Sequence, residues 1–232
     1  MRYGIVRDEW AARIVYEAAE RAIVGYDAHR AAADTSRRQD RLDKLFRGKG
    51  PAPAATAIVA ATDDSGTELY GAVVLDTPYN AGAVIQDLEL GRQLARLHRI
   101  VSGLFVVDEH RGAGLGTQLL REEAAMCALV TGARYIEGFV DDRNGSADFY
   151  RRAGLTVLPH NTGLPARRPT NTPLTHESSV DGHWFYLDLW AHYADRMQCK
   201  ECGSGLAFVP GDGGDLTCPR MRVDAAGQRV HE

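Results

Sequence analysis

Three glycines at alternate positions constrain this chain more than any other feature of its sequence. Gly112, Gly114 and Gly116 lie in the segment DEHRGAGLGTQLL, between the apolar stretch RIVSGLFVV and a helix-like pattern. A strand that enters a glycine-rich turn and then a helix gathers unpaired backbone N–H groups at one point, where the helix dipole adds partial positive charge. Glycine lets the backbone approach an anion closely, and Arg111 can add a charge-assisted contact. The segment therefore predicts a phosphate-binding turn.

Two other phosphate-binding patterns fit the segment less well. A P-loop needs Lys and then Ser or Thr after its last glycine, whereas Thr117 and Gln118 follow Gly116. A dinucleotide-binding turn needs a further glycine where Thr117 stands, and it usually opens a repeated βαβ array. The simplest alternative is a turn that only packs against its neighbours. Such a turn does not need three alternate glycines and an arginine, so the sequence favours it less.

The composition is that of an ordinary globular protein. The chain has 232 residues, of which 44% are hydrophobic and 25% charged, and its formal net charge is −4 at pH 7. This charge does not favour nucleic acid or an anionic membrane as a partner. No apolar stretch approaches the roughly 18 residues of a membrane-spanning helix, and the N-terminus lacks a signal-peptide pattern. We therefore expect a cytoplasmic protein with one medium domain and a smaller appendage.

Hydrophobic periodicity predicts alternating helices and strands. Asp8 is placed to cap a first helix, whose apolar face is expected at four-residue spacing. The residues of that face are Trp10, Ile14, Ala18 and Ala22. Helices are expected over 9–23, within 36–50, after the glycines and within 145–154; strands are expected as a hairpin over 55–78 and over 99–107, 134–140 and 183–190. The unbroken apolar run of 99–107 predicts a strand that is buried on both faces.

Two sequence blocks together resemble the GCN5-related N-acetyltransferase (GNAT) family. The family signature of Arg or Gln, two residues, Gly, one residue, then Gly or Ala matches residues 111–116 (RGAGLG). The family's next block matches residues 144–155 (NGSADFYRRAGL), in the same order along the chain. The resemblance covers roughly residues 3 to 195. It implies an α/β fold with a mixed, mostly antiparallel central sheet flanked by helices.

The resemblance also implies a binding site. Two central strands would splay apart and leave a slot between residues 103–107 and 135–140, where the pantetheine arm of acetyl-CoA lies like an extra strand. The backbone of the glycine turn would receive the pyrophosphate, and Asn144 would hold the arm from the other side. The implied coenzyme-binding residues are Val106, Val107, Arg111, Gly112, Gly114, Gly116, Thr117 and Asn144.

Three residues are candidates for the chemistry. Tyr150 fits the role of an acid, because a phenol near the sulfur can donate a proton to the leaving thiolate; the alternative is a tyrosine packed at the core edge. Glu137 is the candidate general base, in mid-strand beside the slot, two positions from the commonest family placement but on the same strand face. His98 is a weaker candidate, which we expect at the surface.

These features predict an acyl-CoA-dependent N-acyltransferase that moves acetyl from acetyl-CoA to an amine acceptor by direct attack. The alternative is a non-catalytic acyl-CoA-binding module with a regulatory or interaction role. The acceptor is an amine of a small molecule or a protein, and a homodimer is one possible assembly. By the resemblance, the basic segment 36–50 and the proline-rich segment 159–182 wall the acceptor site. A basic wall favours an acidic acceptor, although a charged helix is more often simply solvated.

A cysteine cluster near the C-terminal end predicts zinc. Cys199 and Cys202 form a C-x2-C knuckle, and Cys218 follows at a spacing close to that of a zinc ribbon. Met221 occupies the place of the fourth ligand, and a thioether binds zinc poorly, so His231 is the alternative fourth ligand. A decayed ribbon without metal is the other interpretation. We divide the chain into a GNAT acetyltransferase domain, residues 1–196, and a zinc-ribbon-like appendage, residues 197–232.

Overall fold

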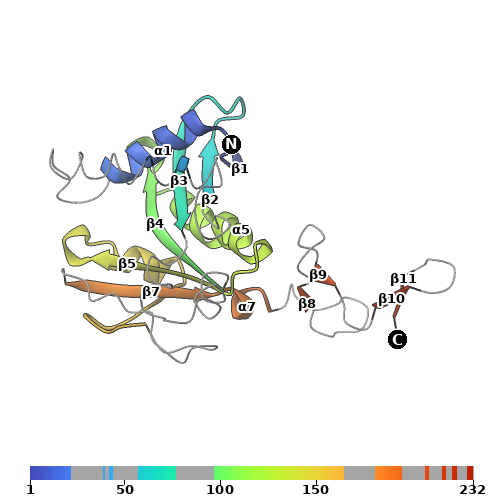
Figure 1. Ribbon diagram of the computed structural model, residues 1–232. Coiled ribbons are helices and arrows are strands. Elements are labelled where there is room, and N and C mark those ends of the chain that lie inside the picture. The colour runs from blue at the N-terminus through green and yellow to red at the C-terminus, as the bar shows by residue number, and fades with distance from the viewer. Residues whose placement is uncertain are drawn as a thin grey trace.

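A seven-stranded sheet forms the centre of the computed structural model, in the order β1-β2-β3-β4-β5-β7-β6 (Figure 1). Its strands are β1 (Arg2–Ile5), β2 (Ala57–Thr62), β3 (Leu69–Asp76), β4 (His98–Val106), β5 (Tyr135–Asp141), β6 (Thr156–Val157) and β7 (Gly182–Asp188). All neighbouring strands are antiparallel except β4 and β5, which run parallel. The mixed, mostly antiparallel sheet expected from the sequence is confirmed.

The structure describes only part of the chain. It covers residues 1–21, 39, 42–43, 57–76, 97–164 and 181–194, together with the backbone of four short strands after residue 206. These are β8 (Ala207–Phe208), which pairs with β9 (Leu216–Thr217), and β10 (Met221–Val223), which pairs with β11 (Arg229–His231). Most of segment 36–50, residues 165–180 and the three zinc-candidate cysteines 199, 202 and 218 lie outside the described residues. The zinc-ribbon appendage and its boundary at residue 197 therefore stay predictions.

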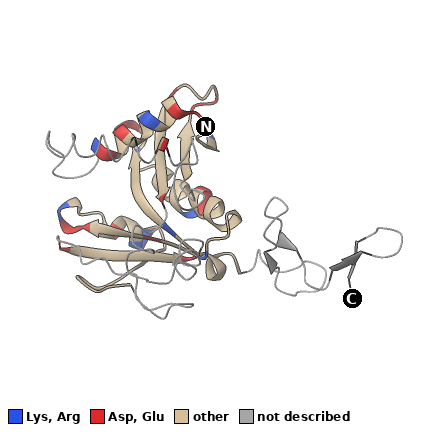
Figure 2. Cartoon of the chain, in the orientation of Figure 1, with Lys and Arg blue, Asp and Glu red and all other residues tan. Residues whose placement is uncertain are grey.

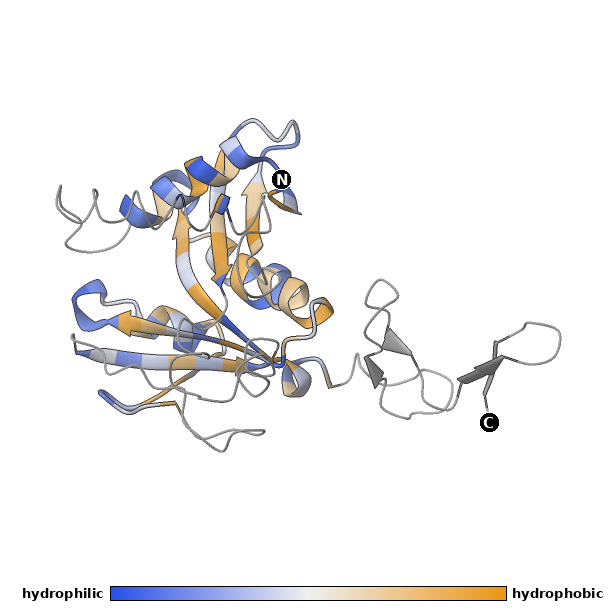
Figure 3. Cartoon of the chain, in the orientation of Figure 1, coloured by the Kyte–Doolittle hydropathy of each residue, from blue (hydrophilic) through white to orange (hydrophobic). Residues whose placement is uncertain are grey.

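Helices cover both faces of the sheet. Their bounds are α1 (Glu9–Arg21), α4 (Leu115–Gln118), the π-helical η2 (Leu119–Ala124), α5 (Ala125–Val130), α6 (Ala147–Arg152) and α7 (Leu189–His192), with short 3-10 turns η1 (Asp108–His110) and η3 (Asp142–Asn144). Because side chains alternate along a strand, Ile58 and Ala60 of β2 pack with α1, while Val59 and Ala61 pack with the run from α4 to α5. Strands β2, β3 and β4 are mostly apolar in Figure 3, whereas β7 is mixed, and Figure 2 shows the charged residues mainly on helices and loops.

The buried face of α1 differs from the sequence prediction. Asp8 caps the helix as expected, since its Oδ1 accepts from the N–H of Ala11 at 2.8 Å. Trp10 and Ile14, however, are 71% and 37% exposed. The helix instead buries Ala12, Val15, Tyr16, Ala19 and Glu20. A Cβ at Gly103 of β4 would lie 2.9 Å from that of Ala19. The small residues thus allow a close approach of helix and sheet, which the four-residue spacing of larger residues did not indicate.

The sheet divides where β4 meets β5. These strands pair over three positions only, His98 with Tyr135, Arg99 with Ile136 and Ile100 with Glu137. Beyond them β4 stays paired with β3, and β5 stays paired with β7, so the two central strands diverge (Figure 1). The splayed strands expected from the resemblance are present. The far part of β4 is consequently half-exposed rather than buried on both faces as its apolar run predicted.

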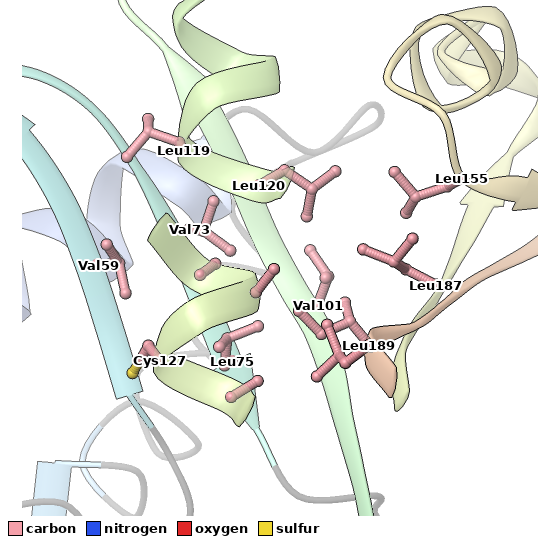
Figure 4. Close-up of a cluster of buried hydrophobic side chains, with 14 of the residues drawn as sticks. Val59, Val73, Leu75, Val101, Leu119, Leu120, Cys127, Leu155, Leu187 and Leu189 are labelled. Carbon is pink, nitrogen blue, oxygen red and sulfur yellow. The ribbon is translucent and has the colours of Figure 1, made fainter. Parts of the chain in front are cut away.

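One hydrophobic cluster joins the two halves of the divided sheet. Figure 4 shows Val101 of β4 and Leu120 of η2 near Leu155, Leu187 and Leu189 from the β6–β7 side. Since these residues come from both sides of the division, their burial holds the halves together where few backbone hydrogen bonds cross. None of the helices that the structure describes is long and apolar enough to span a membrane.

Candidate active site

The glycine turn links the end of β4 to the helical run that begins at α4. Gly112 and Gly114 have φ angles of +79° and +83°, a region that strains residues with a side chain. Gly116 has a different reason to be glycine, because a Cβ there would lie 3.3 Å from the ring of Phe149. From Gly112 to Thr117, no backbone N–H donates a hydrogen bond to another described residue. The turn therefore presents a row of free donors at a helix start.

Two of the expected backbone donors are already engaged. The N–H of Arg111 donates to the carbonyl of Asp108 at 3.1 Å, and the N–H of Val107 donates to the carbonyl of Tyr70 at 2.9 Å. The Arg111 side chain also bonds locally, from Nε to the carbonyl of Val106 at 3.0 Å and from a terminal nitrogen to the Asp108 carboxylate at 3.0 Å. In this structure the N–H groups of Val107 and Arg111 are therefore occupied, and the expected roles of these two residues in coenzyme binding stay predictions.

The free edge of β4 faces the space between the splayed strands. Hydrogen-bonding directions alternate along a strand. Because Val107 bonds toward β3, the backbone groups of Val106 and Leu104 point the other way, toward β5. The Val106 N–H has the direction expected for a coenzyme contact, although the Val106 carbonyl accepts from Arg111 Nε. Leu104 was not among the expected residues, although its position two residues before Val106 gives it the same direction.

A pocket of about 650 Å³ lies along the glycine turn. Of the predicted residues it brings together Val106, Arg111, Gly112, Gly114, Gly116, Thr117, Asn144 and Tyr150. Val107 and Glu137 do not line it. Sequence reasoning missed the other lining residues, Leu104, Phe105, His110, Leu115, Ser146, Phe149 and Arg152. Ser146, Phe149 and Arg152 share a helical face at three-residue spacing, a signal that the sequence did contain.

Tyr150 lies half-buried in the wall of this pocket. Its ring stacks on Phe185 with a centroid distance of 3.8 Å and an interplanar angle of 16°. Gly138 of β5 pairs with Phe185 of β7 and leaves room for this stack, because a Cβ at Gly138 would overlap the Phe185 ring. Burial raises the pKa of Tyr150 to about 12. The phenol is therefore protonated at neutral pH, and its hydroxyl forms no hydrogen bond with a described residue.

Glu137 and His98 form a buried pair instead of lining the pocket. His98 Nδ1 lies 2.9 Å from Glu137 Oε2, and both side chains are 1% exposed. The expected surface position of His98 is wrong, because its pairing with Tyr135 places it where the two halves of the sheet join; its ring also stacks on Tyr135 at 5.1 Å. His98 Nε2 is buried and has no hydrogen-bond partner among the described residues.

Comparison with known proteins identifies the region that contains this pocket. Residues 54–156, which include the glycine turn, match the family model of the acetyltransferase (GNAT) domain. No curated protein matches the sequence.

Several solved structures are similar in fold. A GNAT-family acetyltransferase from Desulfovibrio desulfuricans is 17% identical with a TM-score of 0.53, covering 81% of this chain and 98% of its own. A mutant of the spermidine N-acetyltransferase from Vibrio cholerae is 12% identical with a TM-score of 0.52, covering 84% and 99%. A GNAT-family acetyltransferase from Staphylococcus aureus is 15% identical with a TM-score of 0.50, covering 81% and 99%. At these identities the likeness shows the fold alone, a GNAT-like fold, and the match to the acetyltransferase (GNAT) domain model covers residues 54–156.

Proposed function

We propose that the chain is an N-acetyltransferase that moves the acetyl group of acetyl-CoA to an amine by direct attack. The observation that carries this proposal is a single pocket lined both by the free donors of the glycine turn and by the protonated phenol of Tyr150. The first feature suits a pyrophosphate, and the second suits a leaving thiolate. The match to the GNAT acetyltransferase domain supports the same chemistry.

In this proposal the coenzyme lies along β4. The N–H groups from Gly112 to Thr117 bind the pyrophosphate, and the Arg111 guanidinium adds positive charge beside it. The pantetheine arm pairs with the free edge of β4 at Leu104 and Val106, with Asn144 on the other side of the pocket. The thioester then lies in the direction of the Tyr150 hydroxyl.

The reaction needs two proton transfers. A neutral amine attacks the thioester carbonyl, a C–N bond forms, and the C–S bond breaks as the tetrahedral intermediate collapses. The electron pair of that bond goes to sulfur, and Tyr150 protonates the resulting thiolate. The amine gives up one proton, which then has to leave the site through a base.

We assign that base to the pair of His98 and Glu137 rather than to Glu137 alone. Both side chains are 1% exposed and neither lines the pocket, so in this structure an amine contacts neither of them directly and its proton has to reach the pair through another group. A carboxylate that accepts from Nδ1 fixes the tautomer in which Nε2 carries a lone pair. Because buried polar atoms rarely lack a partner, the unpartnered Nε2 is the atom suited to take the proton.

The competing function is an acyl-CoA-binding module without turnover. The glycine turn supports both functions, whereas the half-buried, protonated phenol of Tyr150 in the pocket wall favours the enzyme. Incubating the protein with acetyl-CoA and a cell extract, followed by mass spectrometry of the products, tests turnover and reveals the acceptor amine. Acetylated products that appear with the protein and not with Tyr150→Phe support the enzyme. Coenzyme binding with no product favours the module.

Replacing Tyr150 with phenylalanine is expected to lower turnover about 10- to 100-fold while coenzyme affinity stays unchanged, because a single acid is removed and the ring stacking is kept. Steady-state kinetics and calorimetry measure the two quantities. Tyr3→Phe, on the edge strand β1, is the control and should behave as the wild type. Unchanged turnover in Tyr150→Phe means that the tyrosine only packs.

Zinc in the C-terminal segment rests on cysteine spacing alone. We expect close to one zinc per chain in protein purified without chelator, because Cys199, Cys202 and Cys218 supply three thiolate ligands. Cys199→Ser should lose the metal without a change in coenzyme affinity. Cys127→Ser is the control, since Cys127 packs in the main core and should not affect zinc content. Metal analysis without zinc in the wild type rejects the ribbon.

A further inference from the structure

Strand β1 forms one edge of the seven-stranded sheet, and its outer side is uncovered. It pairs with β2 alone, and all four of its residues are exposed (Figure 1). An edge strand of this kind presents unpaired backbone groups that can pair with a strand of another chain. What such a strand can bind depends on which of its groups point outward.

The outward backbone groups of β1 belong to Tyr3 and Ile5. The N–H of Val6 donates to the carbonyl of Ile58 at 2.9 Å, so Val6 bonds toward β2. Because hydrogen-bonding directions alternate along a strand, Gly4 also bonds toward β2, and the groups of Tyr3 and Ile5 point the other way. These groups form no hydrogen bond with a described residue. The edge therefore offers two donors and two acceptors.

The side chains at this edge are apolar. Tyr3 and Ile5 lie across from β2 residues that pack with the run from α4 to α5, so both side chains are on that face of the sheet. Met126 and Val130, four residues apart on α5, are exposed apolar residues of the helix that covers this face. Neither Tyr3 nor Ile5 is a charged residue or a proline, the usual protection of an edge strand against pairing.

One register with a second copy of β1 uses all of these groups. When two copies run antiparallel about a two-fold axis at Gly4, Tyr3 of each chain lies opposite Ile5 of the other and exchanges both hydrogen bonds with it. An aromatic residue opposite a β-branched residue is a favourable cross-strand pair. Gly4 alone meets its own copy, so no like charges face each other at the axis.

The charges beside β1 suit the same register. Extended by two residues, it places Arg7 of one chain opposite Met1 of the other. Arg7 is exposed and forms no ion pair with a described residue. The amino group of Met1 lies 2.6 Å from the carboxylate of Asp64, whose side chain is largely exposed. The pairing therefore brings Arg7 beside an acidic residue of the other chain, and the two-fold axis repeats this contact.

We propose that β1 is the interface of a homodimer, in which the β1 strands of two chains pair antiparallel and join the two sheets edge to edge. A second copy fits this edge better than an unrelated extended peptide, because the hydrogen bonds, the Tyr3–Ile5 pairs and the charges are all reciprocal. The interface is separate from the coenzyme pocket, since none of its residues lines that pocket.

A cysteine at the axis tests the register. Opposed residues of a non-hydrogen-bonded antiparallel pair have Cα atoms about 4.5 Å apart, within the range of a disulfide. Gly4→Cys should therefore form a covalent dimer on mild oxidation, seen on a non-reducing gel and reversed by reductant. A Cβ at Gly4 has no heavy atom within 4 Å, so the variant should fold. Arg2→Cys is the matched control, because the two copies of residue 2 would lie roughly 13 Å apart along the strands and should not cross-link.

Sedimentation equilibrium of the full chain measures the dimer itself. The wild type should sediment at twice the mass of one chain. Ile5→Lys should raise the dissociation constant of the dimer at least about tenfold, because each chain then places a charge at the paired edge. Ile5→Pro should do the same, since it removes an outward N–H and leaves the pairing with β2 intact. Ile14→Lys adds the same charge at an exposed isoleucine of α1 and should sediment as the wild type does.

The other outcomes overturn the proposal. A wild type that is monomeric at every concentration has no such interface. A dimer that persists in both folded Ile5 variants, or that cross-links equally through Gly4→Cys and Arg2→Cys, uses another surface. Coenzyme affinity should stay unchanged in all of these variants, so the proposed acetyltransferase function stands or fails separately.

Discussion

Replacing Gly114 with glutamate should abolish coenzyme binding and leave the protein folded. Gly114 has a φ of +83°, and a Cβ added there has no heavy atom within 4 Å. The substitution therefore strains the backbone by roughly 1–2 kcal/mol, but its Cβ creates no clash. Its carboxylate, however, would stand among the free N–H groups that we assign to the pyrophosphate, where a second negative charge repels the ligand. Calorimetry with CoA measures the loss.

Two matched variants separate strain from charge. Gly66 in the β2–β3 turn has a φ of +79° and equally open surroundings, so Gly66→Glu carries the same strain and charge away from the pocket. It should bind CoA as the wild type does. Gly114→Lys keeps the strain at the site and reverses the charge, so it should retain part of the affinity. Unchanged CoA affinity in a folded Gly114→Glu contradicts the phosphate-binding role of the turn.

The sequence predicts this turn well because its determinants are local. A positive φ at Gly112 and Gly114 and the close contact of Gly116 with Phe149 favour glycine over other residues, so they leave a direct pattern in the sequence. The capping role of Asp8 is also determined locally, because its partner Ala11 lies only three residues along the chain. The splaying of the two central strands was predicted from the family resemblance only. No single segment of the sequence indicates which strands stay paired along their whole length.

Other features depend on contacts between distant segments, and the sequence did not reveal them. His98 looks like a loop histidine until its parallel pairing with Tyr135 buries it. The buried face of α1 is chosen by Gly103, more than eighty positions along the chain from Ala19, and not by the helix's own largest apolar residues. The N–H of Val107 is occupied, because it completes the pairing with β3. In each case tertiary hydrogen bonding or close packing overrides a local pattern.

The pair of His98 and Glu137 gives the largest expected effect on stability. It lies at the short parallel contact between β4 and β5, the only strand pairing that joins the two halves of the described sheet. His98→Leu removes one partner of a fully buried carboxylate, which is expected to lower the free energy of unfolding by about 3 kcal/mol. Denaturant unfolding followed by circular dichroism measures the change.

The double variant His98→Leu with Glu137→Leu separates stability from chemistry. Replacing a buried polar pair by apolar residues of similar volume is often neutral, so most of the lost stability should return. If the pair takes the proton from the amine, this stable variant should still turn over at least about tenfold more slowly than the wild type, because a positioned base contributes that much or more. Full turnover in the double variant would remove the pair from the mechanism. Its role would then be to hold β5 against β4 at the point where the slot for the coenzyme opens.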